Sequence, residues 1–311
     1  MNANAERTAQ PLGTRSAILG LLVGVVRGGN QVALKIALTA LPPLWTAFGR
    51  MSISCLTVGL WSRSQGYDLM PTRDEIPKLA LLGVMFTLQI SILHIGADYT
   101  SPAYSVVLVN VNPIMANLIS HFFVPEDRLT PLRLLGLLMA FAGVTWVFSG
   151  KPDPGLAPNP TLGNTLMVIS ALMVAARTVY IQRLVQNMLP EKAVFCQMLI
   201  ALPVFLVGGA FFAGVGERGP LGWQQLAAMT YQGLLVGGVG LLTWIYLLRK
   251  HTPGTVSVFS FVTPFCGVFV SALVFGEEIT PRLLSGVAAV LTGIYLVTRS
   301  GRALPVSEPR S

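Results

Sequence analysis

Two stretches decide the fold: residues 112–148, NPIMANLISHFFVPEDRLTPLRLLGLLMAFAGVTWVF, and residues 263–297, TPFCGVFVSALVFGEEITPRLLSGVAAVLTGIYLV. Each holds a proline within an apolar run, then an acidic pair, Thr-Pro, and two glycines seven residues apart. The chain therefore contains an internal repeat, and equivalent residues extend beyond the two quoted stretches. The matched positions are Gly13 with Gly163, Arg27 with Arg177, Pro102 with Pro253, Pro113 with Pro264, Ser120 with Ser271, Gly136 with Gly286 and Gly143 with Gly293.

The composition favours lipid over water as the solvent of these repeats. Hydrophobic residues make up 53% of the 311 residues, charged residues make up 11%, and the mean hydropathy is +0.65. Soluble domains carry about 25% charged residues. A helix needs about 20 apolar residues to cross the hydrocarbon core of a bilayer. Ten segments qualify, five in each repeat: residues 16–38, 44–62, 78–97, 102–122, 131–149, 161–184, 193–214, 225–248, 254–274 and 281–298.

Because five is an odd number, the second repeat must enter the membrane in the opposite orientation to the first. We therefore predict an all-α polytopic membrane protein with ten transmembrane helices arranged as a 5+5 inverted repeat. Such repeats are typical of secondary transporters, whose substrate site lies near mid-membrane and opens to one side at a time. The predicted parts are an N-terminal tail (1–15), a first repeat (16–150), a linker loop (151–160), a second repeat (161–299) and a C-terminal tail (300–311).

The distribution of Lys and Arg predicts the orientation. With the N-terminus in the cytoplasm, fourteen basic residues fall on the inner side and three, Lys151, Arg218 and Arg282, on the outer side. Positive charge is retained on the cytoplasmic side, so both termini are expected there, in a multi-pass plasma membrane protein of the bacterial inner-membrane type. The formal charge of +8 is spread over short clusters between apolar runs, which argues against a nucleic-acid partner. The first apolar segment is interpreted as a retained helix, because no small-residue cleavage pattern follows it.

Enzyme and metal chemistry find no support in the sequence. Cys55, Cys196 and Cys266 lie inside apolar segments without metal-site spacing, and they are interpreted as small packing residues. Neither HExxH nor GxSxG occurs, and no acidic pair lies within the membrane. We therefore expect no catalytic residue, metal or cofactor. The expected partners are a small-molecule substrate and membrane lipid, while the oligomeric state is left open.

Basic residues lie inside the spans without matching acids. None of the 13 acidic residues falls well inside a span, whereas Arg27, Arg50 and Arg177 do. A charge near the bilayer centre costs at least about 2.5–3.5 kcal/mol, so it faces a wet cavity or a partner. Arg27 is the preferred ligand for a substrate carboxylate, with Asn30 and Gln31 beside it, and Arg177 is a second candidate. Structural roles explain Arg50 and Lys35 better.

Prolines break the fourth and ninth spans in equivalent places. Pro102 and Pro253 are expected at the first helical position, where a missing N–H is harmless. Pro113 and Pro264 are expected mid-span, where each frees the carbonyl four residues earlier, on Val109 and Ser260. Such breaks are tolerated beside a cavity. We therefore interpret Pro113 and Pro264 as hinges, and Asn110 and Ser260 as cavity-wall residues.

Further polar and aromatic residues extend the candidate site. Gln89 lies in the middle of the third span, and Tyr180 lies on the Arg177 side of the sixth. Trp244 is suited to stacking an aromatic or cation-bearing solute. Tyr99 and Tyr104 flank the outer ends of two spans, where they are candidates for gating, although anchoring at the membrane interface explains them better. Since no span carries an Asp or Glu as a proton relay, transport is expected to follow the substrate gradient.

The repeated motif resembles the EamA repeat of the drug/metabolite transporter superfamily, over nearly the whole chain from Arg15 to Arg299. Pro125 stands where many members have glycine, and the first turn has one extra residue. The resemblance implies a ten-helix exporter or exchanger with a central cavity lined largely by spans 1, 3, 4, 6, 8 and 9. The chain looks most like bacterial exporters of aromatic or neutral amino acids. The alternatives are a nucleotide sugar, a purine or a cationic drug as substrate, or a channel.

Overall fold

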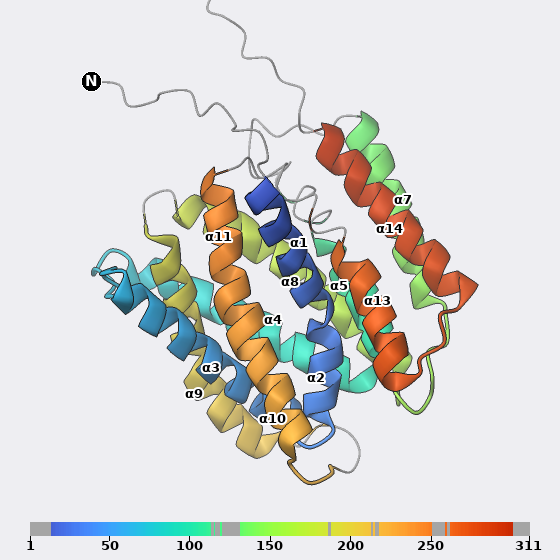
Figure 1. Ribbon diagram of the computed structural model, residues 1–311, viewed down its shortest axis with the longest axis horizontal. Helices are drawn as coiled ribbons and strands as arrows, with labels where there is room; N and C mark the ends of the chain where they lie inside the picture. Colours follow the sequence, from blue (N-terminus) through green and yellow to red (C-terminus); the bar gives the residue numbers. More distant parts are fainter. Residues whose placement is uncertain are drawn as a thin grey trace, which may run out of the picture.

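The structure is a computed structural model that describes residues 14–112, 115, 119, 131–185, 188–212, 214, 218–250, 259 and 262–300. The regular elements within these residues are helices (Figure 1). Their bounds are α1 (Thr14–Gly28), α2 (Asn30–Leu38), α3 (Pro43–Ser64), α4 (Ile76–Tyr99), α5 (Pro102–Val109), α7 (Pro131–Phe148), α8 (Pro160–Leu184), α9 (Pro190–Phe211), α10 (Trp223–Thr230), the π-helix η1 (Tyr231–Gly240), α11 (Leu241–Lys250), α13 (Val262–Phe275) and α14 (Pro281–Ser300).

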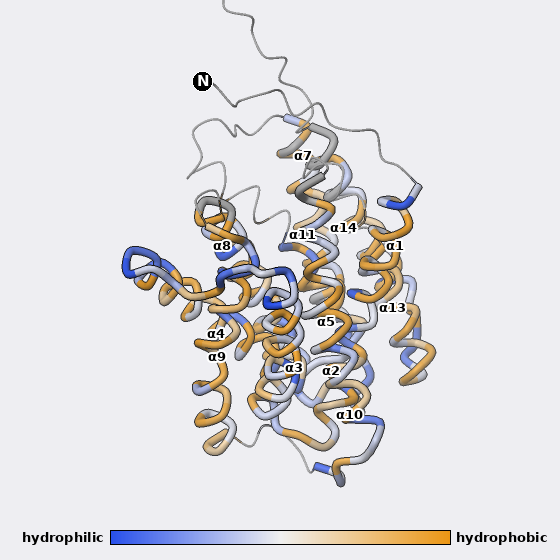
Figure 2. Tube along the Cα trace, turned by 60° about the vertical axis from the view of Figure 1, so that its left-hand side comes forward, coloured by the Kyte–Doolittle hydropathy of each residue, from blue (hydrophilic) through white to orange (hydrophobic). Residues whose placement is uncertain are grey.

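These helices correspond to the ten predicted spans. The first span consists of α1 and α2, the eighth of α10, η1 and α11, and each of the other spans is represented by one described helix. Within the described residues, five segments are long and apolar enough to cross a membrane: Thr14–Leu38, Ile76–Tyr99, Pro160–Ile181, Pro190–Phe211 and Trp223–Trp244. Shorter apolar helices cover Leu134–Val147 and Val262–Phe275. Figure 2 shows hydrophobic residues along the helices and hydrophilic residues gathered at their ends and connections. The predicted all-α, ten-helix fold is confirmed.

Helix starts follow local chemistry. Proline is the first residue of α3, α5, α7, α8, α9 and α14, a position at which its missing N–H has no helical acceptor. Three of these starts are capped, including that of α14, where the Thr280 hydroxyl accepts the N–H of Leu283 at 3.2 Å. The Ser101 hydroxyl accepts the N–H of Tyr104 at 3.4 Å, as expected for α5, and the Asn159 side chain accepts the N–H of Leu162 at 3.2 Å. Proline and an N-cap residue thus fix where α5 and α8 begin.

Contacts between helices are repeated when the two halves are exchanged. Helix α1 packs against α13, and its counterpart α8 packs against α5, the counterpart of α13. In the same way α3 packs against η1, while its counterpart α9 packs against α4. The two halves therefore share one internal plan, and each half's first helix lies against the fourth span of the other half.

Two antiparallel seams join the halves, and each is reciprocal. Between α7 and α14, which lie side by side in Figure 1, a Cβ on Gly143 would lie 3.0 Å from the carbonyl of Gly286, and a Cβ on Gly293 would come even closer to the carbonyl of Gly136. Between α3 and α9, a Cβ on Gly59 would lie 3.0 Å from the ring of Phe195, and a Cβ on Gly209 would lie 3.1 Å from the ring of Trp45. Equivalent residues thus meet from opposite directions, as an inverted repeat requires. This confirms the 5+5 arrangement.

Irregular backbone interrupts the spans that face the centre. The first span breaks at Gly29, between α1 and α2. The eighth span contains η1, and π-helical segments often occur at functional sites. Helix α5 ends at Val109, whose carbonyl accepts the side-chain amide of Asn112 at 2.9 Å, as expected for a carbonyl freed by a proline four residues on. Pro264 lies in the first turn of α13. Pro113, Ser260 and Pro253 lie outside the described residues.

Candidate functional site

Polar side chains gather inside the bundle where the two halves meet. We call this group the polar centre: Arg27, Asn30 and Gln31 from the first span, Gln89 from α4, Arg177 from α8, and Gln232 and Trp244 from the eighth span. Gln31, Gln89 and Gln232 are buried, at 5%, 2% and 0% exposed, and Arg27, Asn30, Arg177 and Trp244 are half-buried. Burying polar groups among apolar helices is costly unless they are hydrogen-bonded, so each group needs a partner.

Arg27 is held at the break of the first span. The guanidinium carbon of Arg27 lies 4.5 Å from the ring centroid of Trp244 on α11, within the range of a cation–π contact. At the break itself, the Tyr231 hydroxyl donates to the carbonyl of Val26, and the Gln232 side chain donates to the carbonyl of Asn30 at 2.9 Å. Helix η1 therefore supports the broken backbone that presents Arg27.

Arg177 enters the polar centre from the other half, at the position equivalent to Arg27. Its Nη1 donates to the Gln197 side chain at 2.9 Å, and its guanidinium carbon lies 5.2 Å from the ring centroid of Phe86. Arg27 and Arg177 thus bring one guanidinium from each half into the bundle. The site therefore carries two positive charges that repel each other, a situation that an anionic group between them would relieve.

Unpartnered polar atoms of both kinds surround these arginines. The acceptors are the side-chain oxygens of Asn30, Gln31, Gln89 and Gln232, which are buried and have no hydrogen-bond partner among the residues that the structure describes. The donors are Nε of Arg177 and, farther along α3, Nε and Nη1 of Arg50. Buried groups without partners are rare in folded proteins. Those on the first, third, sixth and eighth spans are groups that a polar ligand or water would complete.

Arg50 and His94 flank the polar centre. Arg50 is 6% exposed and close enough for its charge to act on His94, which is completely buried on α4. The Ser54 hydroxyl donates to the carbonyl of Arg50 and to that of Gly233, both at 3.0 Å, which ties α3 to η1. The structural role expected for Arg50 is compatible with this location, but two of its N–H donors remain available.

Several predicted residues lie away from the polar centre. The Tyr180 hydroxyl donates to the carbonyl of Lys78 at 3.1 Å, near the start of α4. The Asn110 amide donates to the carbonyl of Val106 at 2.7 Å, within its own helix. Tyr104 is buried, with its hydroxyl beside Gly150. The carbonyl of Tyr99 accepts the N–H of Asn159 at 3.2 Å. Their proposed substrate contact and gating therefore remain predictions.

Two functional candidates were missed in the sequence. Gln197 orients Arg177, and Gln232 supports the break beside Arg27. Gln197 is one amide in an apolar span, and Gln232 lies among apolar residues seven positions after Gln225. Neither has a counterpart amide in the other repeat, where Ala47 and Leu82 occupy the equivalent positions. An isolated amide could have been noted as a buried polar residue, but its partner depends on helix packing.

The predicted outer end of the bundle is closed by charged groups. The Lys35 ammonium donates to the carbonyls of Ala97, Asp98 and Thr100 at 3.0, 3.2 and 2.9 Å, and so it caps the end of α4. Arg218 forms an ion pair with Asp98 at 2.6 Å and donates to the carbonyl of Leu38. Lys35 thus has the structural role expected of it.

A buried carboxylate joins the two halves at the same end. Glu277, from the repeated acidic turn, is 6% exposed and accepts the hydroxyls of Ser101 and Ser271, the latter at 2.6 Å. It also accepts the N–H of Ala103 at 3.3 Å. A carboxylate at a helix N-terminus is favourable, because the N–H groups there carry partial positive charge. The acidic turn therefore fixes the start of α5.

At the opposite end, α4 and α9 are linked by an ion pair. The Lys192 ammonium lies 3.1 Å from Glu75 Oε2. The N–H of Thr72 also donates to this carboxylate, at 2.8 Å. The hydrogen bond from Thr72 and the ion pair with Lys192 lower the pKa of Glu75. Within the described part of the chain, no group of three or more His, Cys, Asp and Glu side chains is arranged to hold a metal ion.

Comparison with known proteins finds the same repeat. The chain matches the model of the EamA-like transporter family twice, over residues 14–149 and 161–299. The resemblance inferred from the repeated motif is confirmed.

Curated relatives cover nearly the whole chain at low identity. An uncharacterized transporter of Archaeoglobus fulgidus is 21% identical over 92% of this chain and 98% of its own length. A probable amino-acid metabolite efflux pump of Salmonella typhimurium is 23% identical over 91% and 94%, and one of Escherichia coli is 22% identical over the same shares. A solved crystal structure superposes with a TM-score of 0.66 at 17% identity, covering 93% of this chain and 99% of that chain, and so supports the fold.

Proposed function

The chain belongs to the EamA-like transporter family and is a multi-pass membrane transporter of that type, and from this premise we propose that it exports amino acids with neutral or aromatic side chains by alternating access. The observation that carries the proposal is the coexistence of unpartnered donors and unpartnered acceptors in the polar centre. An amino acid needs both, since it carries a carboxylate and an ammonium on the same carbon.

The carboxylate is assigned to the arginines. Carboxylate–guanidinium hydrogen bonds are charge-assisted and favour two parallel contacts. Arg177 already has one N–H on Gln197 and keeps Nε free, while Arg27 is fixed by Trp244 at the break of the first span. An anion bound between the two would lower their mutual repulsion. One arginine comes from each half, so a substrate held by both would bridge the inverted repeats.

The ammonium is assigned to the amide oxygens. Asn30, Gln31, Gln89 and Gln232 each keep a buried side-chain oxygen without a partner. An ammonium group donates three hydrogen bonds, so several amide oxygens together replace its water shell without adding a negative charge to the site. A phosphate-bearing solute such as a nucleotide sugar offers few donors to these oxygens. A cationic drug would meet the arginines as like charges.

The walls of the site favour an apolar or aromatic side chain. Trp244 and Phe86 lie against the two arginines, one on each side of the polar centre. Aromatic rings provide a large apolar surface and pack against other rings in offset or edge-to-face geometry. The names of the Salmonella and Escherichia relatives, which contain the words amino-acid metabolite efflux pump, support the same substrate class.

The inverted repeat provides the structural basis for alternating access of the polar centre to the two sides of the membrane. Reciprocal glycine contacts at both seams mean that the two halves can exchange roles by sliding along matching surfaces. The break at Gly29 and the π-helix η1 are the irregular segments beside the polar centre, and we assign the local motion to them. With both termini in the cytoplasm, the Lys35 and Glu277 contacts close the outer side, so this conformation leads toward the cytoplasm.

Counterflow into liposomes that contain purified protein tests the proposal. The panel is phenylalanine, its deaminated acid, its decarboxylated amine, a nucleotide sugar and a cationic dye. The intact amino acid should exchange saturably, while the acid and the amine should exchange far more slowly, because each leaves one set of buried groups unpaired. Faster exchange of the nucleotide sugar or the dye would overturn the substrate class. Single-channel currents would favour a channel, and uphill uptake driven by a pH gradient alone would refute uncoupled transport.

A further inference from the structure

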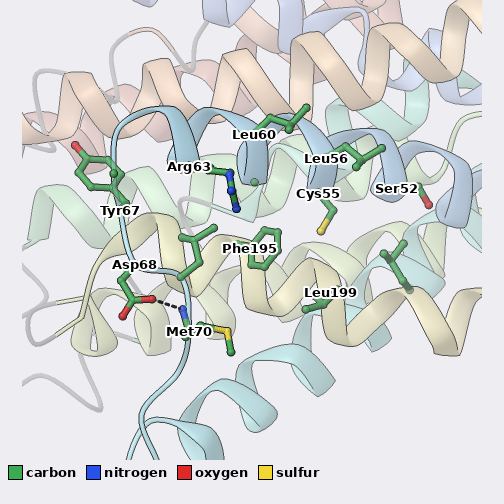
Figure 3. Close-up of a pocket in the computed structure, with 14 residues that line it drawn as sticks. Ser52, Cys55, Leu56, Leu60, Arg63, Tyr67, Asp68, Met70, Phe195 and Leu199 are labelled. Carbon is green, nitrogen blue, oxygen red and sulfur yellow. Dashed lines mark hydrogen bonds between the residues drawn. The ribbon is translucent and has the colours of Figure 1, made fainter.

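A cavity of about 750 Å³ opens between α3 and α9 on the surface of the bundle, and it shares no residue with the polar centre. In Figure 3 one wall comes from α3, the opposite wall from α9, and one end from the segment 66–70 that follows α3. Leu56, Leu60 and Met70, which line it, are 64%, 68% and 76% exposed. In a membrane transporter, an exposed apolar surface of this kind faces the acyl chains of lipids.

Two opposite charges line the same cavity. Arg63, in the last turn of α3, points its guanidinium into the cavity, and Asp68 lies toward the same end (Figure 3). The ion pairs between described residues are Lys192–Glu75 and Arg218–Asp98, so Arg63 and Asp68 are not bonded to each other. One oxygen of Asp68 accepts the N–H of Met70 at 2.9 Å. Its other oxygen and the Arg63 guanidinium have no partner within the described part of the chain.

We propose that this cavity binds one glycerophospholipid whose headgroup carries a phosphate and a primary ammonium. The phosphate binds Arg63 through charge-assisted hydrogen bonds, and the ammonium binds the free oxygen of Asp68. The acyl chain lies along Leu56, Leu60 and Leu199. This occupant completes both charges and covers the apolar wall, which neither water nor a soluble ion does.

The pair of charges selects among lipids. A phosphatidylglycerol headgroup satisfies Arg63 with its phosphate, but it offers only neutral hydroxyls to Asp68 and no positive charge to offset the carboxylate. A choline headgroup has no N–H to donate to the Asp68 carboxylate. The phosphoethanolamine headgroup alone among these three offers an acceptor to Arg63 and a positively charged N–H donor to Asp68.

The depth of the site agrees with this occupant. Arg63 belongs to the basic residues that predict the cytoplasmic face, so the charged end of the cavity lies at the height of the lipid headgroups and the apolar part extends into the hydrocarbon. The cavity also lies on the seam where Gly59 of α3 faces Phe195 of α9. A bound lipid therefore contacts both halves at a place where they must move, independently of which solute the polar centre carries.

Native mass spectrometry of the purified full-length protein tests the proposal. Phosphatidylethanolamine, phosphatidylglycerol and phosphatidylcholine are added in turn, and lipid retention is compared among wild type, Arg63→Gln, Asp68→Asn and the control Arg73→Gln. Arg73 is exposed in the same connection and does not line the cavity. Wild type should retain one phosphatidylethanolamine about tenfold more tightly than the other two lipids, which corresponds to one charge-assisted hydrogen bond.

The variants give opposite selectivity changes. Arg63→Gln should weaken phosphatidylethanolamine and phosphatidylglycerol alike, whereas Asp68→Asn should weaken the former and strengthen the latter. Arg73→Gln should match wild type. Equal retention of the three lipids by wild type, or unchanged phosphatidylethanolamine binding in Asp68→Asn, would overturn the proposal. Displacement of the lipid by a free amino acid would do so too, since it would identify the cavity as a vestibule for solute.

Discussion

Replacing Arg177 by glutamine should separate substrate recognition from stability. The guanidinium of Arg177 makes two described contacts, with the Gln197 side chain at 2.9 Å and with the Phe86 ring at 5.2 Å, and its Nε is unpartnered. Glutamine is shorter and uncharged, but it keeps a hydrogen-bond donor for Gln197. The substitution therefore removes the positive charge from one half of the polar centre and leaves that of Arg27.

The substitution should affect substrate binding more than it affects stability. Loss of a charge-assisted hydrogen bond to a substrate carboxylate costs about 1.5–3 kcal/mol, which weakens binding roughly 10- to 150-fold. For stability, a weaker hydrogen bond to Gln197 and the loss of a cation–π contact worth about 0.5–2 kcal/mol are offset by relief of the buried charge, about 2.5–3.5 kcal/mol. The free energy of unfolding should therefore change by no more than about 1–2 kcal/mol.

The assay is counterflow of labelled phenylalanine, with a thermal melt of each purified protein. The control is Arg282→Gln, which removes an arginine that also lies on an aromatic ring, 4.6 Å from the Trp146 centroid, and donates to the carbonyl of Ser149 at 2.6 Å, at the start of α14. Arg177→Gln should raise the half-saturating concentration while Arg282→Gln leaves it unchanged. The assignment would be refuted if Arg177→Gln kept the half-saturating concentration of wild type, or if both variants raised this concentration equally.

Three further predictions follow from other contacts. Gly143→Val places a Cβ 2.8 Å from that of Ala289, so α7 and α14 must separate and the melt should show a loss of about 1–3 kcal/mol; an unchanged melting temperature would contradict the tight seam. Lys35→Met leaves three carbonyls at the end of α4 uncapped, so amide hydrogen exchange there should accelerate, and equal protection would show that the cap is dispensable. Trp244→Leu removes the ring over Arg27 and should weaken phenylalanine transport about 2- to 30-fold but alanine transport less, whereas equal losses would argue against an aromatic wall.

Much of the fold could be predicted because the membrane imposes strong rules. The lengths of the apolar segments predicted the spans. The matched positions, including the glycines at 136, 143, 286 and 293, predicted the internal repeat. The odd number of spans then required inversion, and the structure shows its consequence in the reciprocal packing of these glycines. Helix starts at Pro102 and Pro131 also followed from local chemistry.

The site was predicted less completely, because its partners come from distant helices. Arg27 and Arg177 stood out as charges without acids, but their contacts with Trp244 and Phe86 depend on how five-helix halves interlock. The π-helix η1 could not be anticipated, since its glycines at 233, 237, 238 and 240 fit a regular helix equally well. Tyr180 shares a helix with Arg177, but its side chain reaches the start of α4, where its hydroxyl donates to the carbonyl of Lys78.

Accessibility of one buried position tests the central claim most directly. Ser170 is completely buried beside Gln89, whose side chain donates to it at 3.2 Å, and Ser170→Cys changes a single atom. In a background without Cys55, Cys196 and Cys266, membrane-impermeant thiol reagents are applied to either face of sealed vesicles. We predict modification from both faces, slowed from both by saturating amino acid. Modification from one face only, or from both at rates that the amino acid leaves unchanged, would contradict an inverted pair of gates around one polar centre.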